Sequence, residues 1–204
     1  ESYYHQYLRI VGLIITEQQL NNRVMKTKIE LKRTNGDVIF SHECENNSVA
    51  KTIEALRTFG KEFDLHCADL RCAYLRCADL RNACLRSACL SGAYLRDTDL
   101  RCADLRFADL RFADLRNADL SGADLRDTDL RFADLRDADL RFADLRDADL
   151  RDADLRFADL RCVDLSGANF RNIKVSERTV FFPLQCPSEG SFVAWKKAGD
   201  MIVK

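Results

Sequence analysis

The sequence predicts an all-β solenoid, a tube in which one short unit is stacked on copies of itself. Three observations favour this fold class. A leucine stands at every fifth position from Leu65 to Leu165, and Phe170 takes the next place. From Ala68 to Ala168, the residue two positions before each of them is small, and it is alanine almost throughout. A period of five fits neither a helix, whose faces repeat at three, four and seven, nor a continuous strand, which alternates in twos.

Each unit must therefore combine a short extended stretch with a bend. In Ala68-Asp69-Leu70-Arg71-Cys72, alternation places Ala68 and Leu70 on one side and the two charged residues on the other. The apolar pair then faces inward, and Cys72 lies at the bend. Since one unit cannot bury its leucine alone, the 22 consecutive units have to stack around a crowded axis. The small position departs from alanine at Thr98, Thr128 and Val163.

This run resembles the pentapeptide-repeat proteins, whose motif is a small residue, Asp or Asn, a central Leu or Phe, and two variable positions. The resemblance covers residues 63–172. It implies a right-handed, four-sided parallel β-helix with four units per coil, so that 22 units give about five and a half coils. Three Ser-Gly pairs fall at corners of such a helix, where turn-forming residues are expected: Ser91-Gly92, Ser121-Gly122 and Ser166-Gly167.

The charge pattern indicates a solvated surface rather than a nucleic-acid site. The chain has a formal net charge of −1, and residues 64–172 contain 22 Asp and 18 Arg without Lys or Glu. Aspartate and arginine columns should run side by side on each face, so that opposite charges offset repulsion between stacked units. We expect no direct nucleic-acid binding. We also expect no membrane association, because the most apolar run, residues 10–15, is too short to cross a bilayer.

The nine cysteines do not follow a pattern typical of disulfides or metal sites. No two of them are 20 residues apart, which is the spacing of residues stacked directly on one another, and no CxxC spacing occurs. We expect free thiols in a reducing cytoplasm, with no metal and no cofactor.

The segment before the repeat is expected to have two parts. Within residues 25–62, alternating polar and apolar residues around Asn35-Gly36 predict a β-hairpin. Asn46-Asn47-Ser48 offers N-cap candidates for a helix that follows, and Gly60 is its expected stop. This α+β cap would cover the apolar end and the unpaired strand edge of the first coil. Residues 1–24 are expected to be an N-terminal extension, either as a further strand or as a segment preceding a start at Met25.

Residues 173–204 follow the repeat and are expected to form a short C-terminal β extension. Their sequence resembles the opening of a small domain that follows pentapeptide repeats in several proteins. The chain reaches Lys204 within the second strand of an expected hairpin, so we expect either a truncated domain or a strand that pairs with another copy. Clustered aromatic residues, including Phe181, Phe182 and Trp195, should cover the last coil or form a homodimer contact at this end of the solenoid.

The sequence contains no recognisable catalytic arrangement. None of its histidines, His5, His42 and His66, is near a plausible nucleophile or carboxylate partner in the sequence, and no glycine-rich phosphate loop occurs. The regularly spaced aspartates offer no environment that would raise the pKa of one above the others. We therefore expect a protein that is not an enzyme.

Outward phenylalanines at corner positions depart from the charged pattern: Phe107, Phe112, Phe132, Phe142 and Phe157. Phe112 and Phe132 are 20 residues apart and should stack on one edge. Two interpretations remain open, because bulky corner residues either tuck against neighbouring coils or form a protein-binding stripe. Together with Phe181, Phe182 and Trp195, these five are the candidate protein-interaction residues.

The expected function is that of a non-enzymatic scaffold that presents charged faces and an aromatic corner stripe to a protein partner or to itself. The family resemblance supplies an alternative, because some pentapeptide-repeat proteins imitate duplex DNA and bind DNA gyrase or topoisomerase. Such a mimic should be strongly anionic along its length. Arginine fills 18 of the 22 positions after the central residue, and these interleaved cations argue against mimicry.

Overall fold

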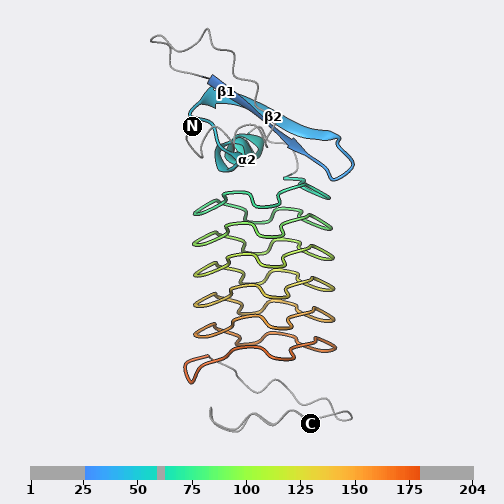
Figure 1. Ribbon diagram of the computed structural model, residues 1–204, viewed down its shortest axis with the longest axis vertical. Coiled ribbons are helices and arrows are strands. Elements are labelled where there is room, and N and C mark those ends of the chain that lie inside the picture. Colours follow the sequence, from blue (N-terminus) through green and yellow to red (C-terminus); the bar gives the residue numbers. More distant parts are fainter. Residues whose placement is uncertain (1–25, 59–62, 180–204) are drawn as a thin grey trace, which may run out of the picture.

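The computed structural model describes residues 26–58 and 63–179, which form a long tube with a small cap over its N-terminal end (Figure 1). Three expectations concern residues outside this part of the chain. They are the N-terminal extension, Gly60 as the stop of a helix, and the C-terminal β extension, which contains Phe181, Phe182 and Trp195.

The corners of the tube are tight turns that repeat every five residues. In the unit around Phe112, the Ala113 backbone N donates to the Leu110 carbonyl oxygen at 3.1 Å, and Phe112 has a φ of 59°. A positive φ at the third residue is the feature of a type II turn, for which Gly or Asn is preferred. Every fifth residue from Cys67 to Asn172 has a positive φ. The bend lies where the sequence predicts it, in a left-handed conformation that most of its residues adopt at a cost.

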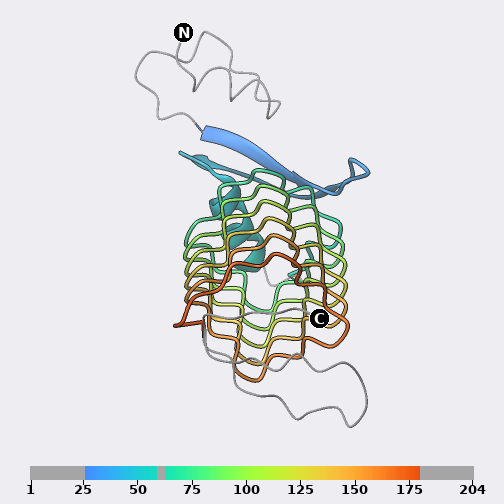
Figure 2. The same ribbon diagram turned by 60° about the horizontal axis from the view of Figure 1, so that its bottom comes forward.

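Successive coils are joined by parallel bridges between residues 20 apart, which means four five-residue units per coil. Asp104 pairs with Asp124, for example: the Leu105 N donates to the Asp124 oxygen at 2.8 Å, and the Asp124 N donates to the Ala103 oxygen at 2.9 Å. In the tilted view of Figure 2 the coils superpose on one another. The prediction of a right-handed, four-sided parallel β-helix is confirmed.

The core is a continuous column of leucines along the axis of the tube. From Leu65 to Leu160 each repeat leucine is at most 3% exposed, and from Leu70 onward the small residue two positions before it is also buried. Thr98 and Thr128 occupy two of these small positions with their hydroxyl groups inside. Each hydroxyl donates to a leucine carbonyl oxygen of the preceding coil at 2.9 Å, which avoids the cost of an unpaired buried donor.

The cap begins with a two-stranded antiparallel hairpin, β1 (Lys26–Lys32) and β2 (Val38–Glu45). Its turn lies at the predicted Asn35-Gly36, where Gly36 has a φ of 94° and donates its N–H to the Arg33 oxygen at 2.9 Å. The helix α2 (Val49–Thr58) follows. Ser48 is its N-cap, because the Ser48 Oγ accepts a hydrogen bond from the Lys51 N at 3.2 Å.

The cap closes the first coil in two ways. Arg33 pairs with Ala68 in an antiparallel bridge, and the Asp69 N donates to the Lys32 oxygen at 2.7 Å, so the end of β1 satisfies part of the first strand edge. Leu31, Ile53 and Leu56 extend the leucine column as one hydrophobic cluster. The predicted small α+β cap therefore covers both the apolar end and an unpaired edge.

Candidate protein-interaction surface

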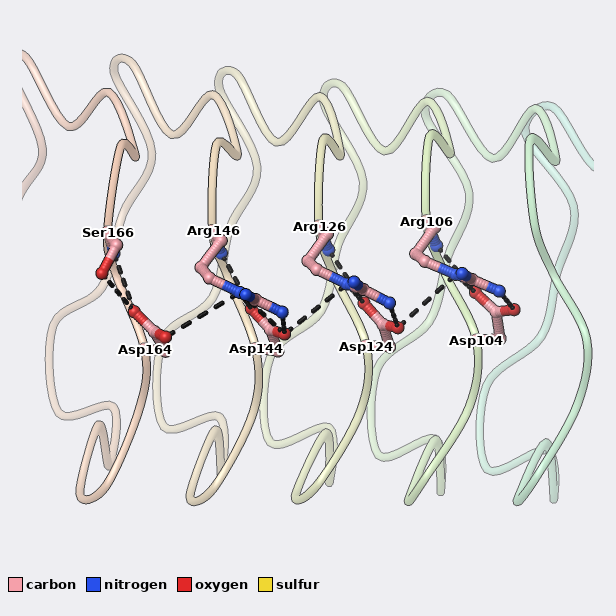
Figure 3. A network of polar contacts seen from close by, with 8 residues as sticks. All are labelled: Asp104, Arg106, Asp124, Arg126, Asp144, Arg146, Asp164 and Ser166. Carbon is pink, nitrogen blue, oxygen red and sulfur yellow. Dashed lines mark hydrogen bonds and ion pairs between the residues drawn. The ribbon is translucent and has the colours of Figure 1, made fainter.

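The faces of the tube carry a regular network of ion pairs. Within a unit, arginine donates two hydrogen bonds to the aspartate two positions earlier. The Arg126 Nε donates to the Asp124 Oδ1 at 2.8 Å, and its Nη2 donates to the Oδ2 at 2.6 Å. The same Oδ2 lies 3.5 Å from the Nε of Arg106 in the coil before. Figure 3 shows how these contacts alternate along one face, and we call each such row an ion ladder.

The ion ladders keep the aspartates charged. The Arg106 hydrogen bonds hold the pKa of Asp104 below its usual value, and Arg146 lowers the pKa of Asp144 in the same way. In return, the carboxylate raises the pKa of Arg106. Because each cation lies against its anion, most of the charge on the faces is compensated locally.

The structure separates most of the candidate phenylalanines. Residues 20 apart stack on one edge of the tube, so Phe107, Phe142 and Phe157 lie on three different edges. Phe112 and Phe132 share the fourth edge, and their rings stack with centroids 5.0 Å apart and planes 3° apart, as predicted. All five side chains are exposed.

A second stacked pair, Tyr74 and Tyr94, was not among the sequence predictions. Both residues stand in the column that is otherwise mostly aspartate, and their ring centroids are 4.6 Å apart with planes 6° apart. The neighbouring Tyr74 hydroxyl raises the pKa of Tyr94. The signal that would have found this pair is the one that found the phenylalanines, namely two aromatic residues 20 positions apart.

The two aromatic pairs lie next to one another. Tyr94 bridges to Asp114 in the next coil, and Phe112 is the corner residue two positions before Asp114. The tyrosines therefore occupy the first two coils beside this edge, and the phenylalanines continue along the edge in the next two. We call Tyr74, Tyr94, Phe112 and Phe132 the aromatic ledge. Three coil steps give it a length of roughly 14 Å.

The two arginines that follow the ledge tyrosines form their ion pairs at a neighbouring corner. Tyr74 and Tyr94 replace the aspartates that would bind Arg76 and Arg96 within their own units. Both guanidinium groups instead contact Asp97 at a neighbouring corner, with Nε–Oδ2 distances of 3.2 and 3.5 Å. The ledge thus exposes four aromatic rings, with exposed fractions from 44% to 61%, among charges that are paired elsewhere.

In the described part of the chain, His66 contacts a backbone carbonyl group and a cysteine. The His66 Nδ1 lies 2.8 Å from the Arg86 carbonyl oxygen, and its Nε2 lies 3.2 Å from the Cys67 Sγ. Burial raises the pKa of Cys89, which makes that thiol less reactive. Within residues 26–58 and 63–179, no three metal-ligating side chains come together, and no helix is long and apolar enough to span a membrane.

Comparison with known proteins agrees with this architecture. The model of the family described as pentapeptide repeats matches residues 64–101, 103–141 and 133–172, in eight copies. No curated protein sequence matches the chain.

Among solved structures, the pentapeptide repeat protein Rfr23 from the cyanobacterium Cyanothece 51142 is 34% identical, with a TM-score of 0.46 over 46% of this chain and 64% of that one. HetL from Nostoc sp. strain PCC 7120, a protein involved in heterocyst differentiation regulation, is 35% identical, with a TM-score of 0.37 over 54% of this chain and 59% of that one. The chain thus spans less than two thirds of either protein. The alr5209 protein from Nostoc PCC 7120 is 32% identical, with a TM-score of 0.41 over 63% of this chain and 96% of that one. Since the family model matches more than half of its length, the chain belongs to the pentapeptide repeat family.

Proposed function

We propose that this protein is a non-enzymatic scaffold that binds a protein partner through the aromatic ledge. The observation that carries the proposal is the stacking of two exposed aromatic pairs side by side on one surface of the β-helix. Clustered exposed aromatic residues mark protein interfaces, where Tyr and Phe bury large rigid areas at a low cost in side-chain entropy.

The aromatic ledge contributes little to the folding of the tube. Its rings are exposed, and the leucine column and the backbone bridges are complete without them. Phe112 and Phe132 also adopt φ values of 59° and 60°, a left-handed region that bulky residues enter at a cost. Exposed rings at strained positions are more readily explained by display to a partner than by stability.

The tube around the aromatic ledge is suited to a fixed binding surface. Every coil bonds to the next through its backbone, and the ion ladders tie neighbouring units together on each face. The ledge residues are therefore held in position before a partner arrives, which lowers the entropy cost of association.

A matched pair of double variants tests the proposal. Phe112→Ser/Phe132→Ser removes half of the aromatic ledge, whereas Phe142→Ser/Phe157→Ser removes two exposed corner rings from other edges. We expect the ledge variant to lose partners recovered by affinity capture and mass spectrometry, and the control to retain them. Light scattering on both variants would show whether the partner is a second copy. If the ledge variant keeps every partner and its oligomeric state, the ledge is not the binding surface.

The alternative of DNA mimicry finds no support in the geometry. A mimic needs uncompensated negative charge along its length. The face aspartates instead accept hydrogen bonds from arginine, as Asp124 does from the Arg126 Nη2 at 2.6 Å. Inhibition of DNA gyrase supercoiling at micromolar protein concentration would nevertheless favour this alternative over the scaffold.

A further inference from the structure

One ion ladder is interrupted near its N-terminal end. On the face drawn in Figure 3, Arg106, Arg126 and Arg146 each bind the aspartate two positions earlier. One coil before Arg106, the equivalent carboxylate is replaced by Cys84, and Arg86 has no ion pair among the described residues. Arg171 is the other repeat arginine in this situation, because Asn169 stands two positions before it.

The interruption coincides with a depression in the surface. A depression of about 610 Å³ is lined by Phe63, Asp64, His66, Asn82, Cys84, Arg86, Asp104 and Arg106. Its two carboxylates already have partners, since Asp64 binds Arg33 at 3.2 Å and Asp104 binds Arg106 at 2.6 Å. Arg86 is therefore the lining arginine without an ion pair, and its charge acts on the Asp104 carboxylate of the next coil only at longer range, where it helps to lower the pKa of Asp104.

The position of Arg86 leaves its donors available. Its guanidinium carbon lies over the Phe107 ring, 5.5 Å from the centroid. A cation–π contact of this kind orients the group without using its N–H donors. The carboxylate that takes these donors in neighbouring units shows how a ligand would bind, with one oxygen on Nε and the other on Nη2.

We propose that the depression at Arg86 binds a carboxylate group of a ligand, which takes the place of the aspartate that Cys84 replaces. Planar bidentate pairing with carboxylates is what the guanidinium fork recognises best. Phe63 offers an apolar wall for the rest of the ligand, and Asn82 offers an amide. The site is separate from the aromatic ledge, which lies on another face and edge, so either proposal can fail without the other.

Binding can be followed through the side-chain Nε–Hε signals of arginine in ¹H–¹⁵N NMR spectra. We expect a saturable shift of the Arg86 signal on titration with sodium acetate at constant ionic strength, with chloride as the reference salt. Arg171 is an internal control, because it also lacks an ion pair but does not line the depression. Equal, non-saturating shifts at Arg86 and Arg171 would overturn the proposal.

A substitution that restores the ion ladder provides the sharper test. Cys84→Asp supplies the missing carboxylate from within the chain, so acetate should bind at least about tenfold more weakly, as expected when a charge-assisted hydrogen bond is no longer available. Cys89→Asp is the matched control, because it adds the same charge one unit later, where Ser91 rather than arginine follows. Acetate binding that survives Cys84→Asp unchanged would contradict the proposal.

Two further titrations identify the ligand. A blocked Gly-Asp-Gly peptide that shifts Arg86 as acetate does would assign the carboxylate to an acidic protein segment, whereas a response to acetate alone would assign it to a small organic acid. Inorganic phosphate that binds more tightly than acetate, with the same sensitivity to Cys84→Asp, would replace the carboxylate assignment by a phosphate site.

Discussion

At the scale of single residues, the corner positions place an unusual demand on side chains. Twenty-two consecutive corners have positive φ values, yet glycine occupies only Gly92, Gly122 and Gly167 among them. Asn and Asp tolerate this left-handed conformation because their short polar side chains bond locally, whereas Phe has no such compensation. The five corner phenylalanines are therefore tolerated by the fold rather than required by it.

Phe142 allows this cost to be measured, because it is 67% exposed and has a φ of 61°. We expect Phe142→Asn to raise the free energy of unfolding by about 1 kcal/mol, since asparagine enters the left-handed region more easily. Phe142→Ala is the control: it removes the same ring but keeps a side chain without a local hydrogen bond. Chemical denaturation of the three proteins checks the prediction, and an equal gain for both variants would trace the effect to ring exposure instead.

At the scale of elements, the cap shows which contacts the sequence could predict. The hairpin turn at Asn35-Gly36 and the N-cap within residues 46–48 are local signals, and they lie where they are predicted. The role of Asn47 was not predictable, because it depends on residues brought together by folding. Its Nδ2 donates to the carbonyl oxygens of Thr27 in β1 at 3.1 Å and of His42 in β2 at 2.7 Å, while its Oδ1 accepts from the Ser48 N at 2.9 Å.

Asn47 thus joins the hairpin to α2, and its removal should loosen the cap. The Asn47 Oδ1 also accepts a hydrogen bond from the hydroxyl of Thr52, a residue that is fully buried. We expect Asn47→Ala to cost about 1–3 kcal/mol, because buried donors and acceptors lose their partner. Asn47→Asp keeps the acceptor contacts and loses the two donated bonds, so it should fall in between. Hydrogen exchange of the β1 and β2 amides measures the effect, and unchanged protection in Asn47→Ala would contradict this role.

At the scale of the whole molecule, strict periodicity made the β-helix predictable, and the same regularity hid its exceptions. The stacking of Phe112 on Phe132 follows from their spacing of 20 residues and is confirmed. Aspartate is replaced in its columns by Tyr74, Tyr94 and Cys84. The consequence of each replacement depends on which arginine loses its carboxylate partner. Treating each aspartate column as uniformly charged overlooks the positions where another residue replaces aspartate. Their effect becomes visible only in the coil register, which shows which arginine lies beside each of them.

The ion ladders run along all four faces, so they should give the whole tube a characteristic response to acid. The pKa values of Asp99, Asp109, Asp114 and Asp144 are all lowered by hydrogen bonds from arginine. A carboxyl whose pKa is lower in the folded state binds fewer protons there than in the unfolded chain. Its stabilising effect is therefore complete above the unfolded pKa of about 4 and is lost as the pH falls through the folded value.

The ordinary aspartate pKa is about 4. We accordingly expect the denaturant midpoint to be nearly constant between about pH 5 and pH 7 and to fall steeply as the pH decreases below this range. The side chains of Asp144 and Arg146 are 28% and 44% exposed, so added salt should weaken the acid dependence by screening. Asp144→Asn should flatten the acid limb, because it removes one carboxylate that contacts arginines of two coils. Phe142→Ser, which changes no charge in the same region, should leave that limb unaltered. A midpoint that does not change between pH 2 and pH 7 would show that the ion ladders make no net contribution to stability.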